Sequence, residues 1–149
     1  MKLAIMQPYF LPYIGYFQLI NAVDKFVIYD DVNYINKGWI NRNNLLAGGK
    51  AQLFSIPLKE ASQNKHIVDI AVANDASWRK KLLKSIQQSY QKAPFFRETY
   101  PIIEDIINYE AENISDLNRK GIFEVNAYLG ITTEIVIHSA VYNNSHLKA

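Results

Sequence analysis

A segment rich in proline and aromatic residues, residues 6–20, constrains the fold of this chain more than any other stretch. Its sequence is MQPYFLPYIGYFQLI, and it lies between two short apolar runs at residues 2–6 and 26–29. These runs are typical of buried strands, and the apolar spacing of residues 17–23 is that of a short amphipathic helix. Pro8 and Pro12 stiffen the intervening loop, whereas Gly15 lets a ligand approach the backbone closely. Because open α/β sheets bind ligands at the carboxyl ends of their strands, this order predicts a ligand site.

The composition is that of one folded domain. The chain has 149 residues, of which 49% are hydrophobic and 20% charged, enough to bury a sizeable core. The absence of cysteine excludes a disulfide framework, a thiolate zinc site and a catalytic thiol. No apolar segment approaches the roughly 20 residues that span a bilayer, and the N-terminus leads directly into a strand pattern without a signal peptide. We therefore expect a cytoplasmic location without membrane insertion.

The rest of the pattern predicts an α/β domain covering residues 1–149. We expect strands at 39–41, 51–58, 67–73 and 131–137, and a helix capped by Asn74 or Asp75. A second helix is predicted to begin at Pro101, and a third to be capped by Ser115 and closed by Gly130. The expected fold is a single domain with a mostly parallel, Rossmann-like sheet and flanking helices. The tail, residues 138–149, lacks a core pattern and is expected to be loosely ordered.

The N-terminal strand–loop–helix unit is distantly similar to that of nucleotidyltransferases, which hold a triphosphate with an H-x-G-H motif at the helix start. In this chain the corresponding residues are Tyr13, Ile14, Gly15 and Tyr16. The spacing survives, but tyrosines replace both histidines and remove the cationic donors. The sequence therefore does not favour nucleotidyl transfer by that mechanism, although the helix start could still accept an anion.

Two further segments carry candidate site residues. Asp30 and Asp31 end the second predicted strand, where a carboxylate could hold ligand hydroxyls or act as a base. A strand-end turn explains the same dipeptide equally well. Lys37, Trp39 and Arg42 bring an ammonium, an indole and a guanidinium together, a combination suited to a phosphate and a flat ring. A solvated turn is the competing interpretation of this segment.

Other residues point away from metal and nucleic-acid binding. His66, His138 and His146 match no metal-ligand spacing and are interpreted as surface residues, so no metal site is expected. Arg79, Lys80, Lys81 and Lys84 form a basic helix face, which we interpret as solvated because the formal net charge is only +2. We expect no nucleic-acid partner, and the sequence identifies no cofactor.

Taken together, residues 6–20, the YDDVN run at 29–33 and the KGWINRN run at 37–43 resemble the WbqC-like protein family of bacteria. The similarity continues to residues 128–131. It implies a cytoplasmic protein of lipopolysaccharide O-antigen biosynthesis that binds a nucleotide-activated sugar or an activated acyl donor as its small-molecule substrate, as an acyl or aminoacyl transferase. The catalytic candidates are Asp30 and Asp31, and the ligand-binding candidates are Gln7, Pro8, Tyr13, Gly15, Tyr16, Lys37, Trp39, Asn41 and Arg42.

The chain also departs from the family pattern. The resemblance implies a further α/β portion after the strand at 131–137, whereas this chain ends at Ala149. We therefore expect a truncated version, with a homo-oligomer or a partner protein completing the fold. Because no nucleophile motif is present, a non-catalytic module that binds a nucleotide sugar or a partner protein is the alternative.

Overall fold

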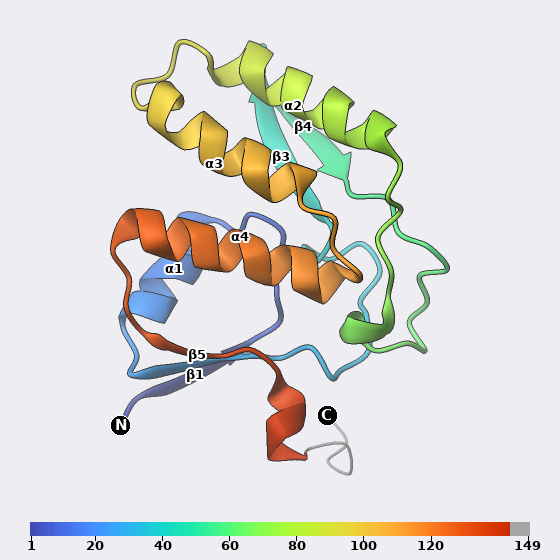
Figure 1. Cartoon of the computed structure of the whole chain (residues 1–149), viewed down its shortest axis with the longest axis vertical. Coiled ribbons are helices and arrows are strands. Elements are labelled where there is room, and N and C mark those ends of the chain that lie inside the picture. Colours follow the sequence, from blue (N-terminus) through green and yellow to red (C-terminus); the bar gives the residue numbers. More distant parts are fainter. Residues whose placement is uncertain (144–149) are drawn as a thin grey trace.

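The computed structural model describes residues 1–143. Its three-stranded sheet contains β1 (Leu3–Met6), β2 (Lys25–Ile28) and β5 (Glu134–Val136), all parallel and in the order β1-β2-β5. The chain is therefore an α/β protein, as predicted. The two helices α1 (Ile14–Asn21) and α4 (Ile114–Leu129) lie on the same side of this sheet (Figure 1).

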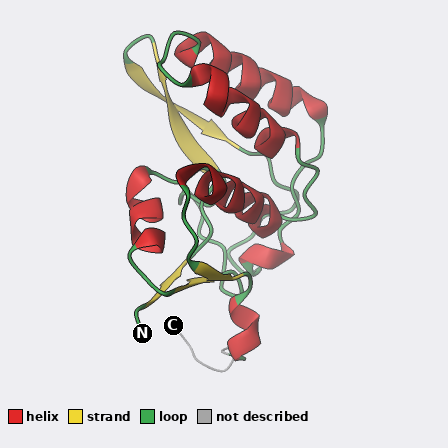
Figure 2. Ribbon diagram, turned by 60° about the vertical axis from the view of Figure 1, so that its left-hand side comes forward, coloured by secondary structure: helices red, strands yellow, loops and turns green. Residues whose placement is uncertain are grey.

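A separate antiparallel hairpin lies at the other end of the molecule. It consists of β3 (Arg42–Ala47) and β4 (Lys50–Ser55), joined by Gly48 and Gly49 with φ of 56° and 77°. Glycine suits this turn because other residues rarely adopt positive φ. Two helices, α2 (Ala76–Tyr90) and α3 (Phe96–Asn108), pack beside the hairpin, and α4 lies between them and the parallel sheet (Figure 2). The expected short strand at 39–41 is wrong, because pairing begins only at Arg42.

The strand expected at residues 67–73 is also wrong. Ile67–Asp69 forms the 3₁₀ turn η1, and only isolated bridges at Ala71 and Val72 follow. Ile67 and Ile70 are both fully buried, and the Ile70 amide donates to the Ile67 carbonyl at 3.3 Å. Two apolar residues three positions apart thus share one face of a tight turn, an arrangement that a β-branched run does not reveal.

Of the three helices that follow the hairpin, α2 begins where expected, whereas α3 and α4 begin at other residues. Asp75 caps α2, as predicted, by accepting a bond from the Ser77 amide. However, Pro101 lies inside α3 rather than at its start, at an exposed position from which it donates no backbone hydrogen bond. Asn113, not Ser115, caps α4 by accepting from the Asp116 amide at 2.9 Å. Gly130 closes α4 with φ 69°, as expected.

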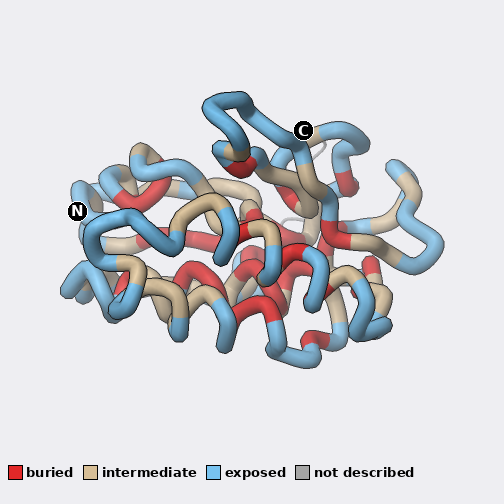
Figure 3. Tube along the Cα trace, turned by 90° about the horizontal axis from the view of Figure 1, so that it is seen from above, coloured by how far each residue is buried: buried red, intermediate tan, exposed pale blue. Residues whose placement is uncertain are grey.

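The core is divided into two clusters of buried side chains. Figure 3 shows the buried residues in red, mostly in the interior of the chain trace. One lies among α2, α3 and the hairpin, and the other packs α1 and α4 against the sheet, where Tyr16, Phe26 and Ile122 meet. Arg79 belongs to the buried residues rather than to a solvated basic face. Its side chain donates to the carbonyls of Ile107 and Tyr109, at 2.8 and 3.2 Å, and so caps the end of α3.

Candidate functional site

The carboxyl ends of the three parallel strands meet at one edge of the sheet. Gln7 follows β1, Tyr29 and Asp30 follow β2, and His138 lies two residues beyond β5. The Tyr29 amide donates to the Met6 carbonyl at 2.8 Å, which extends the β1–β2 pairing to this edge. Ligands in open α/β sheets bind at this end of the strands, so the edge is the first place to look for a site.

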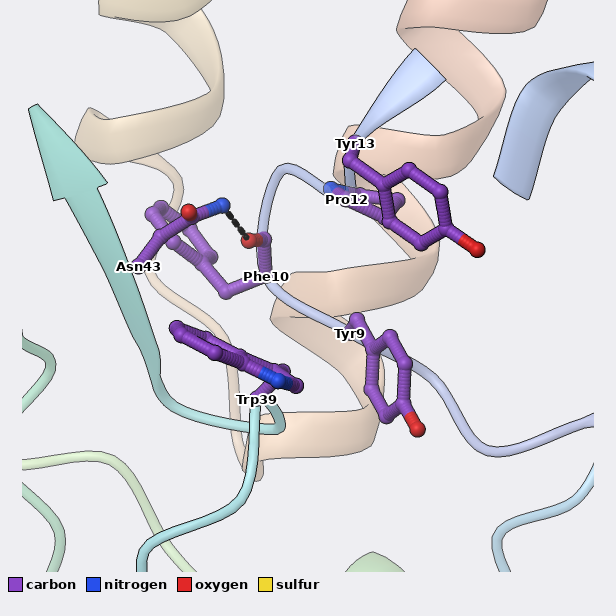
Figure 4. A pocket seen from close by; sticks show the side chains of 6 residues that line it. All are labelled: Tyr9, Phe10, Pro12, Tyr13, Trp39 and Asn43. Atoms are coloured by element: carbon purple, nitrogen blue, oxygen red, sulfur yellow. Dashed lines mark hydrogen bonds between the residues drawn. The ribbon is translucent and has the colours of Figure 1, made fainter. Parts of the chain in front are cut away.

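An aromatic pocket opens beside the loop that follows β1 (Figure 4). Its volume is about 290 Å³, and Tyr9, Phe10, Pro12, Tyr13, Trp39 and Asn43 line it. Tyr13 and Trp39 remain 70% and 46% exposed, although large aromatic residues normally bury most of their surface. Their rings offer flat apolar faces, and the phenol and indole groups add hydrogen-bonding atoms.

Asparagine side chains hold the two loops that form this pocket. Asn43 donates to the carbonyls of Phe10 and Leu11, at 3.1 and 2.6 Å (Figure 4). Asn118 of α4 is buried and donates to the carbonyls of Pro8 and Ile40, at 2.9 and 2.8 Å. Because Pro8 precedes Tyr9 and Ile40 follows Trp39, Asn118 fixes the backbone on which two pocket walls stand.

Arg42, a cationic residue beside Trp39, makes hydrogen bonds to the backbone of its own loop. Arg42 donates from Nε to the Gly38 carbonyl at 3.0 Å and from Nη2 to the Lys37 carbonyl. The centre of its guanidinium lies 5.9 Å from the ring of Trp39. Lys37 is exposed and has φ 61°, an unusual backbone conformation that the Arg42 bond supports. Arg42 therefore shapes the loop in addition to any contact with a ligand.

The two aspartates occupy different environments. Asp30 is only 1% exposed, and its Oδ2 accepts a 2.7 Å bond from the hydroxyl of Ser115, a residue on α4. Asp31 is half-buried and accepts a bond from the hydroxyl of Ser139. The Ser139 hydroxyl in turn accepts from the backbone amide of Asp30 at 3.2 Å. Both carboxylates are thus joined to segments more than 80 positions away in the chain.

His138 and Arg119 complete this polar cluster. Nδ1 of His138 lies 3.0 Å from Oδ2 of Asp30, and the Arg119 guanidinium lies 3.8 Å from the same oxygen. Arg119 also pairs with Asp116 at 3.2 Å. We call Asp30, His138 and the four residues around them the polar cluster: Asp30, Asp31, Ser115, Arg119, His138 and Ser139. No group of three or more His, Cys, Asp or Glu residues within residues 1–143 is arranged to hold a metal ion.

The structure separates the predicted site residues into three groups. Tyr13 and Trp39 line the pocket, with Gly15 against the Tyr13 ring. Arg42 lies beside the Trp39 ring, and the carbonyl of Lys37 accepts a bond from Arg42. Asp30 and Asp31 belong to the polar cluster, which shares no residue with the pocket lining. The remaining four lie in the packed framework and do not line the pocket: Gln7, Pro8, Tyr16 and Asn41.

The framework group has definite structural contacts. Tyr16 is buried, and its hydroxyl donates to the Gln7 carbonyl at 2.9 Å. Burial raises the pKa of the Tyr16 phenol far above its usual value, so this residue stays protonated. Asn41 accepts from the Tyr34 hydroxyl at 2.8 Å and donates to the Ile56 carbonyl at 2.9 Å. Their ligand roles stay predictions, and their positions favour a structural role.

Four members of the polar cluster were missed by sequence reasoning. The sequence predicts a helix cap at Ser115 and a surface residue at His138, and it predicts no role for Arg119 or Ser139. A usable signal was present, because His138 and Ser139 follow a predicted strand just as Asp30 and Asp31 do. The first residues of the expected loose tail are therefore fixed to the core, while residues 144–149, including His146, lie outside the described part of the chain.

Comparison with known proteins agrees with the resemblance of the N-terminal motifs. The model of the WbqC-like protein family matches residues 7–149. A protein of Mycobacterium tuberculosis (strain ATCC 25618 / H37Rv), named Uncharacterized protein Rv1507c, is 30% identical over 135 residues. That alignment covers 90% of this chain and 58% of the relative, so the chain spans less than two thirds of the relative's length. No solved structure matches.

The family match includes every element that builds the pocket and the polar cluster, because residues 7–149 contain the loop after β1, the 37–43 segment, the start of α4 and the end of β5. The chain therefore belongs to the WbqC-like protein family.

Proposed function

We propose that this protein acts in the cytoplasm in bacterial surface-polysaccharide (O-antigen) biosynthesis. In this proposal it binds a nucleotide-activated sugar or an activated acyl donor in the aromatic pocket, as an acyl or aminoacyl transferase. Membership of the WbqC-like family supports a role in surface-polysaccharide biosynthesis, and the aromatic pocket supports a ligand with a flat ring. None of the helices within residues 1–143 has the length and apolar character needed to cross a bilayer.

The observation that carries the proposal is the exposure of aromatic rings around a cavity. Tyr13 and Trp39 keep much of their surface open to solvent, with Tyr9 between them and the core (Figure 4). At about 290 Å³ the cavity is slightly smaller than pockets that enclose a drug-sized ligand, which begin near ~300 Å³. It would accept one base or sugar ring by stacking and leave the remainder of a nucleotide sugar outside.

The surroundings of the pocket suit the charged part of such a ligand. Lys37 and Arg42 lie on the loop that carries Trp39, and a guanidinium beside an aromatic ring is a common phosphate-binding arrangement. Tyr13, a residue of the pocket lining, is also the N-cap of α1, and its side chain does not cap the first amides of this helix. A Rossmann-like, distantly nucleotidyltransferase-like N-terminal unit would use these amides for phosphate.

A non-catalytic binding module is the second candidate, and the pocket lining itself favours it. None of the six lining residues is an aspartate, glutamate, histidine or lysine. Stacking and hydrogen bonding are therefore available in the pocket, whereas acid–base chemistry would need groups from outside it. Turnover measurements on ligands that bind would decide between the transferase and the binding module.

Fluorescence can test binding directly because the chain has two tryptophans. In a Trp78→Phe background, Trp39 becomes the sole reporter, and we expect saturable quenching by UDP-N-acetylglucosamine, UDP or acetyl-coenzyme A. Tyr13→Ala in this background should weaken ligand binding at least about fivefold, because stacking on one aromatic residue contributes ~1–3 kcal/mol. Tyr128→Ala, which removes an exposed tyrosine ring outside this pocket (45% exposed, against 70% for Tyr13), is the control. Unchanged fluorescence with every compound would refute the proposal.

A further inference from the structure

The polar cluster places a half-exposed imidazole in front of a buried carboxylate. The side chain of His138 is 36% exposed, whereas that of Asp30 is 1% exposed, and 3.0 Å separates Nδ1 from Oδ2. We propose that His138 is a catalytic proton acceptor, positioned by Asp30, that activates a hydroxyl or amino group of a sugar for acyl transfer. This inference rests on the proposed transferase function and locates its chemistry outside the aromatic pocket.

The contact with Asp30 selects one tautomer of the imidazole. An aspartate carboxylate can only accept, so Nδ1 of His138 must carry the hydrogen that it donates to Oδ2. In the neutral ring the lone pair then lies on Nε2, at the opposite end from Asp30. A buried carboxylate that orients a histidine in this way is the arrangement that prepares a general base.

Arg119 lies against the imidazole without occupying the lone pair of Nε2. Its Nη1 is 3.0 Å from Nδ1 and 2.9 Å from Nε2 of His138. An atom equally distant from both nitrogens cannot lie in line with the outward-pointing lone pair of either one. The other nitrogen of the guanidinium pairs with Asp116 at 3.2 Å, which fixes the arginine in this position. A substrate hydroxyl can therefore approach Nε2 from solvent.

Asp30 is held firmly enough to act as a positioning residue. Its Oδ2 accepts from the hydroxyl of Ser115, and its backbone amide donates to the hydroxyl of Ser139. Both serines are at most 1% exposed, so these bonds are protected from water. Asp30 itself is too buried to touch a substrate, and its role is exerted through His138.

The polar cluster and the loops of the aromatic pocket both contact α4. Asn118 holds the loops of the pocket, and the next residue, Arg119, contacts His138. Consecutive Cα atoms are ~3.8 Å apart, so both sites are anchored on the same turn of one helix. A ligand whose flat ring stacks on Trp39 could extend its sugar along this turn toward His138.

The chemical step balances without a metal or a redox partner. Nε2 of His138 takes the proton from the sugar hydroxyl or amine, and the freed electron pair forms the new bond to the acyl carbon. The bond from that carbon to the leaving group breaks, and the leaving group departs with the electron pair. The proton on His138 then passes to the leaving group or to water.

The test uses p-nitrophenyl acetate as the activated acyl donor and glucosamine as the acceptor. We expect wild-type protein to accelerate release of p-nitrophenolate and formation of acetylated glucosamine. His138→Gln should lower this rate at least about tenfold, since general bases contribute ~10²–10⁴-fold. His66→Gln, an exposed histidine outside the cluster, is the matched control and should retain the wild-type rate. Equal rates for wild type and His138→Gln, or no acceleration by wild type, would overturn the proposal.

The role of Asp30 needs a readout that a purely structural residue would not change. Nitrogen-15 NMR of His138 should show the hydrogen on Nδ1 in wild type, and Asp30→Asn should lose this preference together with the acyl-transfer rate. If Asp30→Asn does not fold, the tautomer of the wild-type ring still tests the contact between His138 and Asp30. A wild-type ring with its hydrogen on Nε2 would exclude the proposed arrangement. The Trp39 titration is independent of His138, so loss of nucleotide binding and loss of acyl transfer can be told apart.

Discussion

Asn118 and Pro8 are 110 positions apart in the sequence, yet the side-chain amide of Asn118 donates to the Pro8 carbonyl at 2.9 Å. The same amide donates to the Ile40 carbonyl at 2.8 Å. One buried side chain on α4 therefore joins the two loops of the aromatic pocket, and its removal should affect both stability and binding.

We expect Asn118→Ala to lower the free energy of unfolding by about 2–4 kcal/mol, because two buried carbonyls lose a donor at ~1–3 kcal/mol each. Urea denaturation measures the loss. Quenching of Trp39 by a nucleotide should weaken in the same variant at temperatures where it is still folded. Asn44→Ala, at an exposed position on β3, should change either property little. A loss of stability below about 0.5 kcal/mol would show that Asn118 is not the support we describe.

Gly15 is expected to control the position of the Tyr13 ring. A Cβ at residue 15 would lie 2.3 Å from Cε2 of Tyr13, which is far too close. Gly15→Ala should therefore displace the ring and weaken ligand binding. In a Tyr13→Ala background the clash is absent, and Gly15→Ala should instead stabilise the protein by up to about 1 kcal/mol through helix propensity. Thermal unfolding of the four proteins in this double-mutant cycle, together with the Trp39 titration, checks both signs.

The stability of the protein should fall above pH 10 because of Tyr16. Burial raises the pKa of Tyr16 well above its usual value of 10. The unfolded chain releases this proton near pH 10 and the folded protein does not, so the contribution is complete below pH 10 and is lost as the pH rises further. The expected slope is about 1.4 kcal/mol per pH unit from this group.

The Tyr16→Phe variant shows how much of the loss of stability above pH 10 comes from Tyr16. The variant should lose about 1 kcal/mol at neutral pH, because the bond to the Gln7 carbonyl disappears, and should fall less steeply than wild type above pH 10. Other tyrosines remain in both proteins and cancel in the comparison. Tyr13→Phe, at an exposed tyrosine, is the control and should follow the wild-type curve. Parallel pH profiles for wild type and Tyr16→Phe would contradict the burial argument.

Arg79 should be far more important for stability than the neighbouring lysine. Arg79→Met leaves the carbonyls of Ile107 and Tyr109 without their donor at the end of α3, so we expect a loss of about 2–4 kcal/mol. Lys80→Met, on the exposed side of the same helix, should change stability by less than about 0.5 kcal/mol. Chemical denaturation of the two variants measures the difference. Equal losses of stability would support the interpretation that Arg79 lies on a solvated helix face, as the sequence predicted.

The parts of the fold that could be predicted are those specified by local sequence. Local residues predicted the Asp75 cap at the start of α2 and Gly130 at the end of α4. Residues 67–73 were misassigned because the burial of Ile67 and Ile70 depends on packing against distant elements, which a β-branched run does not encode. Pro101 was misplaced for a related reason, since an exposed helix position tolerates the loss of one bond.

The candidate site shows the same division. Tyr13 and Trp39 were recognisable as exposed aromatics in loops, and the structure brings both to one pocket. Ser115 carries no local signal of a site, and the position of His138 after a predicted strand does not by itself point to Asp30, which is 85 and 108 positions away from these two residues. Sequence reasoning could have grouped Asp30 with His138 only by treating the end of each predicted parallel strand as one shared edge.

The parallel pairing of β2 with β5 affects how the chain folds while the ribosome is still synthesising it. Val27 pairs with Val136, so β2, the middle strand of the sheet, can pair with β5 only after more than 100 further residues have been synthesised. During translation at ~5–20 residues per second, β2 would remain without that neighbour for several seconds after it leaves the ribosome. We expect nascent chains that stop before residue 134 to be prone to aggregation and to depend on chaperones.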